Sequence, residues 1–211
     1  MKISVIMPVY LGDFEGAAKN RTQKFIRAVR SFMAQTHKDK ELIVIADGDP
    51  SVAKTIKNHF SGGLANGLIK IVEHKEHRGF VGAVRQSGID VATGRVCLNL
   101  DSDDELLSHH LANVDATFDP EKYEWAYFNF YRKLDELKNI EEHVIARPDL
   151  EGLCTANVVW RKDLDATWNG CDGRQDNKSF NKQLIQKHPN FHKIFGCGYV
   201  VHHAVIAGAT V

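Results

Sequence analysis

Short apolar runs recur along the first half of the chain and are separated by segments of helical pattern. Their continuous apolarity and shortness predict strands that are buried on both faces. The runs cover residues 3–7, 41–46, 68–72 and 96–100. Between them, apolar side chains repeat with the spacing of amphipathic helices. These helices are expected over about 22–33, 51–60 and 80–93. The order β-α-β-α-β-α-β predicts a parallel sheet with right-handed crossovers.

Local signals suggest where these elements begin and end. Pro8 is expected to end the first strand, because proline donates no hydrogen bond to a sheet. Thr22 and Ser51 are expected to cap the first two helices. Gly94 is expected to end the third helix, just before the strand at 96–100.

The second half of the chain is less regular. Expected there are a helix over 106–118, strands over 125–132, 152–161 and 199–205, a charged surface helix or loop over 134–143, a loop over 167–177 and a helix over 176–187. Neither a repeat nor an obvious linker divides the chain. We therefore expect a single α/β domain over residues 1–211, with a mixed, mainly parallel sheet flanked by helices.

Composition narrows the possible functions. The 211 residues carry 27 basic and 27 acidic side chains, so the net charge is zero and offers no basic footprint for nucleic acid. The four cysteines form no C-x-x-C pair, which favours reduced thiols over a disulfide framework or a zinc site. The sequence shows no signal peptide and no apolar run of bilayer length, so a cytoplasmic protein without a transmembrane segment is expected.

Three carboxylates follow the strand predicted at 96–100. Asp101, Asp103 and Asp104 lie within four positions, where they repel one another unless a cation shares them. Hard cations such as Mg²⁺ and Mn²⁺ prefer oxygen ligands, often two carboxylates together with substrate phosphates. The pattern predicts a site for a divalent metal and a nucleotide diphosphate. The alternative is a solvated acidic loop that caps the helix after it.

Other polar and aromatic side chains are expected at the same edge of the sheet. Tyr10 and Asp47 follow the first two strands, and Arg85 lies near the start of the helix over 80–93. Taken singly, Asp47 fits a turn and Arg85 fits a solvated helix face. Ligands of open parallel sheets bind beyond the carboxyl ends of the strands, so their shared location favours a ligand site.

These motifs resemble one known family. The segments that carry the resemblance are Ile3-Ser-Val-Ile-Met-Pro-Val-Tyr10, Ala34-Gln-Thr36, Glu41-Leu-Ile-Val-Ile-Ala-Asp-Gly48, Gly82-Ala-Val-Arg85-Gln86-Ser-Gly-Ile, Ala92-Thr-Gly94 and Leu100-Asp101-Ser-Asp103-Asp104. They are similar to the GT-A-fold glycosyltransferases, most closely family 2, over residues 3–107. The resemblance implies a nucleotide-sugar-binding half over 1–107 and an acceptor-binding half over 108–211.

The resemblance also implies roles for individual residues. It assigns donor binding to Pro8, Val9, Tyr10, Asp47, Arg85, Asp101 and Ser102. Asp47 would accept a hydrogen bond from the ring N–H of the base. Asp103 would be the main ligand of Mn²⁺ or Mg²⁺, with Asp101 beside it. His202 or His203 would complete the metal shell, and the other would face the surface.

The sequence departs from the family pattern at three places. Ala46 and Asp49 flank the base loop where an aspartate and a serine are common, which leaves the base open. Gln86 stands where an asparagine usually follows the helix arginine. Asp176 is the remaining acidic residue at the start of the late helix, and it is either the general base or a helix cap.

The expected function is transfer of a sugar from a nucleotide diphosphate to an acceptor hydroxyl. The donor expected is a UDP-sugar, such as UDP-glucose, and the acceptor a saccharide or another small molecule. Inversion follows if Asp176 is the base, and retention stays open. Candidate acceptor contacts are Trp160, Trp168, Asn169 and Arg174, although a tryptophan in a short domain also fits the core.

Two alternatives to a glycosyltransferase are another kind of enzyme and a protein without catalytic activity. A sugar nucleotidyltransferase would need a glycine-rich basic loop after the first strand, and the segment 11–16 is acidic instead. A non-catalytic nucleotide-sugar-binding module would keep the donor site without a base. Donor sugar, acceptor and oligomeric state are left open.

Overall fold

The structure is a computed structural model, and it describes residues 1–13, 19–135, 140–171, 176–196 and 198–202. The strands are β1 (Ile3–Val9), β2 (Lys40–Asp47), β3 (Ile69–His74), β4 (Val96–Asn99), β5 (Glu105–Leu106), β6 (Trp125–Phe128), β7 (Phe130–Asp135), β8 (Ile140–Val144), β9 (Val158–Arg161), β10 (Phe191–Ile194) and β11 (Tyr199–His202). The helices are α1 (Arg21–Met33), α2 (Pro50–His59), α3 (Ser61–Ala65), α4 (Val81–Val91), α5 (His110–Thr117) and α6 (Asp176–Lys187), with a 3₁₀ turn over Thr155–Asn157.

The larger sheet has seven strands in the order β10-β6-β9-β4-β1-β2-β3. β1 pairs in parallel with β2 and β4, and β2 pairs in parallel with β3. β9 runs antiparallel to both of its neighbours, β4 and β6, while β10 is parallel to β6. The predicted mixed, mainly parallel sheet is therefore confirmed.

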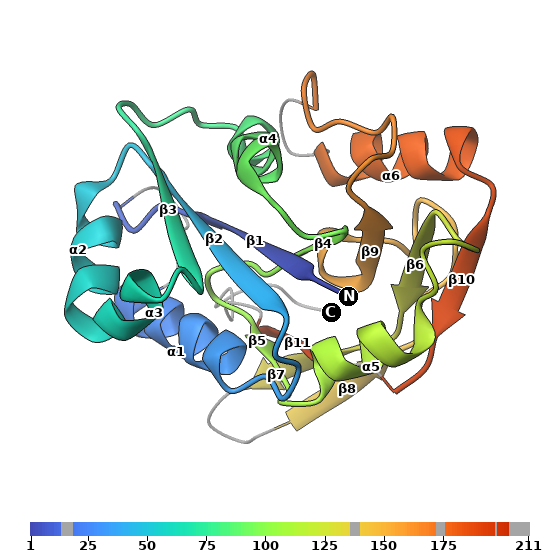
Figure 1. Ribbon diagram of the computed structural model, residues 1–211, viewed down its shortest axis with the longest axis horizontal. Coiled ribbons are helices and arrows are strands. Elements are labelled where there is room, and N and C mark those ends of the chain that lie inside the picture. The colour runs from blue at the N-terminus through green and yellow to red at the C-terminus, as the bar shows by residue number, and fades with distance from the viewer. Residues whose placement is uncertain (14–18, 136–139, 172–175, 197, 203–211) are drawn as a thin grey trace.

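Helices cover both faces of this sheet (Figure 1). In that view α4 and α6 lie above the sheet, and α1 and α5 lie below it. Side chains of β1 and β2 alternate between the two faces, so Met7 and Val44 pack with α1 while Ile6 and Ile45 pack with α4. The result is one apolar layer on each face, which explains why both strands are apolar throughout.

A second sheet of four strands has the order β5-β11-β7-β8. β5 follows the acidic stretch directly, and β11 pairs antiparallel with it, Tyr199 opposite Leu106. β11 also pairs in parallel with β7. This pairing places β11 next to the acidic residues 101–104, which lie between β4 and β5.

Pro8 does not end β1, contrary to the sequence prediction. Ile6 accepts a hydrogen bond from the backbone N–H of Leu100, so its peptide groups face β4. Pro8 lies two residues on and faces the same side, past the last β1–β4 pair at Asn99. Its missing N–H therefore costs the sheet no hydrogen bond, and β1 continues to Val9 against β2.

The predicted helix ends also need correction. Asn20, rather than Thr22, stands at the cap position of α1, with a left-handed φ of 58°. Asp49 caps α2, because its side chain accepts from the N–H of Ser51. Gly94 ends no helix. A Cβ there would lie 2.5 Å from the Ser4 hydroxyl oxygen, so glycine is needed for close approach to β1.

The second half holds three further corrections. Residues 105–106 form β5, and the helix predicted over 106–118 begins only at His110. The strand predicted over 125–132 is two strands in different sheets, broken at Asn129, whose side chain accepts from the N–H of Ala146. The charged segment predicted as a surface helix or loop contributes to β7 and β8 instead, with residues 136–139 outside the described chain.

Candidate active site

A pocket of about 270 Å³ opens at the carboxyl ends of β1 and β2. It is lined by Pro8, Val9, Tyr10, Arg21, Asp47, His77, Gly79, Phe80, Val81, Val84, Arg85, Asp101, Ser102 and Asp103. Every residue that the resemblance assigns to donor binding is among them, together with the main predicted metal ligand. Parallel strands position this set, because their carboxyl ends meet at one edge of the sheet.

Asp101 and Asp103 face this pocket from the loop after β4. Burial, followed by the negative charge of Asp101, raises the pKa of Asp103 above its ordinary value. A raised pKa means that the carboxylate form is disfavoured by its surroundings. A cation placed between these two side chains would relieve that cost.

Asp104 turns away from the pocket into the protein, where only 4% of it is exposed. Its carboxylate accepts from the Tyr199 hydroxyl at 3.0 Å and from the backbone N–H of His202 at 2.8 Å. The Tyr199 hydroxyl in turn accepts from the N–H of Asp101 at 3.1 Å. The third aspartate therefore ties β11 to the acidic loop. Burial and the charges of Asp101 and Asp103 raise its pKa well above the usual value.

Arg85 is buried on α4 and bonds Asp101 at 2.9 Å. A second guanidinium nitrogen lies 3.3 Å from the amide oxygen of Asn177, at the start of α6. The guanidinium carbon lies 4.9 Å from the ring centre of Trp168. Arg85 thus connects the acidic loop with the end of α6 that begins at Asp176.

Asp47 is buried at the end of β2 and is surrounded by hydrogen-bond donors. The Nδ1 atoms of His74 and His77 lie 3.1 and 2.6 Å from its oxygens. The backbone N–H of Arg78 donates to the same carboxylate at 3.1 Å. The ring of His77 also stacks on Tyr10, with centroids 4.0 Å apart and planes 16° from parallel.

Three polar side chains at or beside this pocket, Arg21, Arg27 and His77, are not among the residues predicted from the sequence. Arg21 lines the pocket from α1, donates to the carbonyl of Gly12 and lies 5.8 Å from the Tyr10 ring centre. Arg27 donates to the backbone carbonyl of Asp103 at 2.6 Å. His77 lines the pocket and contacts both Tyr10 and Asp47. Its position three residues after β3, at the carboxyl edge of the sheet, was the available signal.

Among the remaining predicted metal and base residues, the structure describes His202 and the backbone of Asp176. His202 is buried, and its Nε2 lies 3.0 Å from Glu105, so in this structure its ring faces that carboxylate. His203 and Arg174 fall outside the described residues. Asp176 begins α6, as the sequence predicted for that helix.

The predicted acceptor tryptophans are core residues in this structure. Trp160 packs edge-on against Phe180, and Trp168 stacks on the same ring at 4.2 Å. Trp168 is 1% exposed, and its ring lies against the guanidinium of the pocket residue Arg85. Asn169 is exposed in the loop next to it, where its N–H donates to Thr167.

Comparison with known proteins decides the family. The model for glycosyl transferase family 2 matches residues 4–198. The chain belongs to glycosyl transferase family 2. An uncharacterized glycosyltransferase of Nostoc sp. is 30% identical over 118 residues, 56% of this chain and 33% of that protein. One from Rickettsia conorii is 37% identical over 103 residues, 49% of this chain and 15% of that protein. The family 2 chain thus spans a third or less of these relatives.

Solved structures confirm the GT-A fold. TarS 1–349 of S. aureus in complex with UDP-GlcNAc superposes with a TM-score of 0.74 at 16% identity, covering 100% of this chain and 62% of TarS 1–349. GalNAc-T7 with UDP, GalNAc and Mn²⁺ gives a TM-score of 0.65 at 15% identity, covering 97% of this chain and 44% of that one. Within the described part of this family 2 chain, helices are all too short or too polar to cross a membrane.

Proposed function

We propose that this family 2 protein transfers a sugar from a uridine diphosphate donor to an acceptor hydroxyl, with a divalent metal at Asp101 and Asp103. One observation carries the proposal. One pocket gathers the Tyr10 ring, a buried carboxylate, two arginines and two further carboxylates at the carboxyl edge of the sheet. These are the groups needed for a base, a diphosphate and a metal.

Asp47 and Tyr10 support a uracil base. A carboxylate accepts hydrogen bonds but donates none, so Asp47 selects a base with a ring N–H at the matching position. Uracil has such an N–H, whereas the corresponding nitrogen of cytosine is an acceptor. The Tyr10 ring supplies a flat aromatic surface for stacking. TarS and GalNAc-T7 were both solved with UDP or a UDP-sugar, which agrees with this choice.

The donor set fits a hard cation. No group of three or more His, Cys, Asp or Glu side chains in the described residues is arranged to hold a metal. Two carboxylates completed by phosphate oxygens are nevertheless a common arrangement for Mg²⁺, and Mn²⁺ accepts the same ligands. Burial and the charge of Asp101 raise the pKa of Asp103, and a bound cation would offset both effects. A bound Mn²⁺ or Mg²⁺ would act as a Lewis acid that stabilises charge on the departing diphosphate.

The protein's own residues orient the donor and the acceptor. Arg85 holds Asp101 in place and extends to Asn177, so the acidic loop and the start of α6 keep a fixed relation. Asp176 begins that helix, where the helix dipole favours a carboxylate. As general base, Asp176 would take the proton from the acceptor hydroxyl while that oxygen attacks the anomeric carbon, which gives inversion. The acceptor side would then be built by residues 108–211.

The first test is donor cleavage. A panel of UDP-, GDP-, CDP- and ADP-sugars is incubated with the protein, with and without Mn²⁺, and release of nucleoside diphosphate is measured. We expect release from one uridine donor, dependent on Mn²⁺ and increased by the right saccharide acceptor. Absence of metal-dependent binding for every nucleotide would contradict the proposal.

A variant of Asp176 distinguishes an enzyme from a non-catalytic binding module of the same fold. Asp176→Asn keeps the size of the side chain but removes the base. For an enzyme we expect turnover to fall by about 100-fold or more, with UDP affinity within about twofold of the wild type. Equal turnover in both proteins would exclude Asp176 as the base. No observation in the structure favours a nucleotidyltransferase.

A further inference from the structure

We infer that His77 competes with the base of the donor for the same subsite, and therefore sets the affinity of the protein for its nucleotide. The inference rests on the proposed function, because it takes Tyr10 and Asp47 as the base-binding pair. It assigns His77 a role that neither the family match nor the related structures give.

His77 makes both contacts proposed for the base. Its ring lies 4.0 Å from the Tyr10 ring and within 16° of parallel. Its Nδ1 lies 2.6 Å from Asp47 Oδ2. A flat ring that stacks on Tyr10 while a ring nitrogen faces Asp47 reproduces the interactions expected of uracil.

The two occupants exclude each other. Stacked aromatic rings are separated by about one ring thickness, so the 4.0 Å spacing leaves no room for a base between His77 and Tyr10. Asp47 Oδ2 is likewise engaged at 2.6 Å. A base that uses this face of Tyr10 together with Asp47 must displace the imidazole.

His77 is the most easily displaced of the three donors on Asp47. Its side chain is 45% exposed, whereas that of His74 is 8% exposed and is also bonded to the Ser87 hydroxyl. The third donor is the backbone N–H of Arg78. When His77 leaves, two donors still hold the carboxylate in place.

The backbone packs closely at His77 and has space at Gly79, so the displacement proposed is a movement of the His77 side chain. Gly79 has φ of +73° and nothing within 4 Å of where its Cβ would be, so the segment has space at that point. Gly48 is different: a Cβ there would lie 2.2 Å from the His77 backbone nitrogen. The segment thus rests closely on the end of β2 on one side and is open on the other.

The test is calorimetric titration of UDP, in the presence of Mn²⁺, into the wild type, His77→Ala and His59→Ala. His59 is an exposed histidine on α2 and is absent from the pocket lining, so it serves as the matched control. We expect His77→Ala to bind UDP about threefold to tenfold more tightly than the wild type, because the base no longer displaces a stacked ring. His59→Ala should match the wild type.

A probe without a base gives an internal control. Pyrophosphate with Mn²⁺ should bind the wild type and His77→Ala equally, because it does not enter the base subsite. His77→Asn, which keeps a polar group near Asp47 but no aromatic ring, should lie between the wild type and His77→Ala.

The outcomes separate this inference from the proposed function. Unchanged or weaker UDP binding by a folded His77→Ala protein, with normal pyrophosphate binding, would overturn the role of His77 and leave the proposed function standing. No UDP binding by either protein would overturn both. Binding by His77→Ala alone would support both.

A spectroscopic measurement follows the ring directly. The Hε1 proton of His77, assigned by its loss in His77→Ala, should show an upfield ring-current shift from Tyr10. Saturating UDP with Mg²⁺, which is diamagnetic and leaves nearby proton resonances sharp, should move it to the position of an unstacked histidine. A resonance that stays in place at saturation would contradict displacement.

Discussion

Carboxylates at opposite edges of the same sheet differ in their electrostatic surroundings, although Glu41 and Asp104 are both buried and Asp103 is partly buried. Glu41, at the amino edge, has a pKa of about 2, well below the usual value near 4.5. Asp103 and Asp104, at the carboxyl edge, have pKa values above the usual one. All three lose solvation on burial. The difference must therefore lie in what surrounds them.

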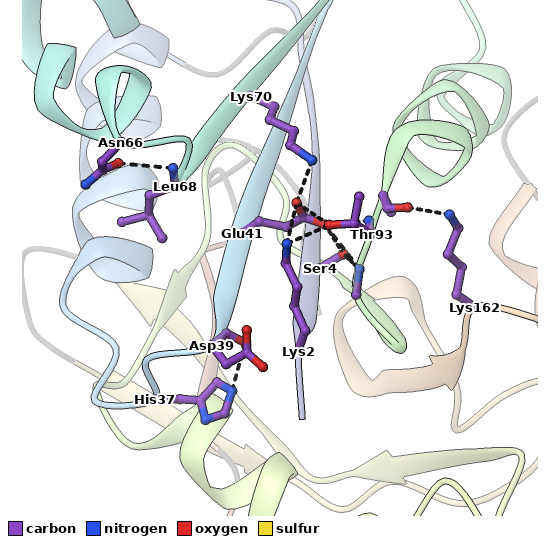
Figure 2. Close-up of polar contacts among 12 residues, drawn as sticks. Lys2, Ser4, His37, Asp39, Glu41, Asn66, Leu68, Lys70, Thr93 and Lys162 are labelled. Carbon is purple, nitrogen blue, oxygen red and sulfur yellow. Dashed lines mark hydrogen bonds and ion pairs between the residues drawn. The ribbon is translucent and has the colours of Figure 1, made fainter.

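Glu41 is supplied with every donor it needs. Figure 2 shows its carboxylate among Ser4, Thr93 and the ammonium groups of Lys2 and Lys70. Lys70 lies 2.8 Å away, the Ser4 hydroxyl donates at 2.6 Å, and the Thr93 N–H donates at 2.6 Å. Lysine and hydrogen bonds outweigh the cost of burial, so the pKa falls. This group is complete within the protein and holds together the starts of β1, β2 and β4.

At Asp103 and Asp104 the compensation is incomplete: Lys24 and Arg21 act on Asp103, and the His202 N–H and Tyr199 donate to Asp104, but burial and neighbouring charges outweigh them. The charges of Asp101 and Asp103 act on Asp104, and that of Asp101 acts on Asp103, so repulsion adds to desolvation. A carboxylate group that is satisfied internally serves the fold. One that stays short of positive charge at the mouth of a pocket indicates a site for a cation.

The largest effect should follow from removing one of the pocket carboxylates. Asp103→Asn removes a proposed metal ligand, so we expect Mn²⁺-dependent release of nucleoside diphosphate to fall by about 100-fold or more. The melting temperature should stay the same or rise, because a disfavoured charge is gone. Thermal melting measures the effect on stability, and a donor-cleavage assay measures the effect on activity. A large loss of stability with normal cleavage would show that Asp103 serves the fold and not the metal site.

Glu41→Gln should lower the stability of the protein and leave its affinity for UDP nearly unchanged. The variant removes a charge whose lowered pKa corresponds to about 3 kcal/mol of stability near neutral pH. Because Glu41 lies at the amino edge, we expect UDP affinity to stay within about twofold where the variant is folded. Urea unfolding and UDP titration test both statements, and Ser51→Ala at the exposed start of α2 is a milder control.

The contribution of the Glu41 charge to the unfolding free energy should depend on pH in a definite direction. A lowered folded-state pKa stabilises the protein fully above the unfolded value near 4.5, and the contribution is lost as pH falls toward about 2. The difference in unfolding free energy between the wild type and Glu41→Gln should therefore shrink over that range. A difference independent of pH would show that Glu41 acts through packing and not through its charge.

Addition of metal should affect only the carboxyl edge. We expect Mn²⁺ to raise the melting temperature of the wild type and of Glu41→Gln, but not that of Asp103→Asn. The increase should diminish as pH falls through the raised pKa of Asp103, because protons then compete with the metal. Scanning calorimetry at two pH values measures this. An equal increase in Asp103→Asn would place the metal elsewhere.

The smallest effect should come from Tyr199→Phe. This change removes the hydroxyl that accepts from the N–H of Asp101 and donates to Asp104. The acidic loop would lose one link to β11, and we expect Mn²⁺-dependent UDP affinity to fall about threefold to tenfold. Tyr127→Phe is the matched control. Equal affinity in both variants would show that β11 does not position the loop.

Much of the donor half could be predicted from the sequence because its signals are local. Apolar runs gave the strands, and the residues just past Val9, Asp47 and Asn99 meet at one edge whenever such strands are parallel. The same logic would have added His77, which follows β3. The predicted end of β1 at Pro8 was wrong because the effect of a proline depends on where the neighbouring strand ends, which the sequence does not show.

The second half was less predictable because its signals are long-range. Asp104 and Tyr199 are 95 residues apart, and no local pattern links them. At the break between β6 and β7, the Asn129 side chain accepts from the N–H of Ala146, 17 residues away. The charged segments pair as β7 and β8 with Arg132 beside Glu142, a contact that requires the chain to turn back on itself. The sequence leaves Trp168 open as a sugar contact or a core residue, and its stacking on Phe180 shows that it is buried in the core.

The most direct test of the central claim is calorimetric titration of UDP into the wild type and Asp103→Asn, each with and without Mn²⁺. The account predicts that the wild type binds UDP with Mn²⁺ and that affinity falls at least about tenfold when either the metal or the Asp103 carboxylate is removed, with no further loss when both are. Equal UDP affinity in all four titrations would contradict a metal site at the carboxyl edge of the sheet.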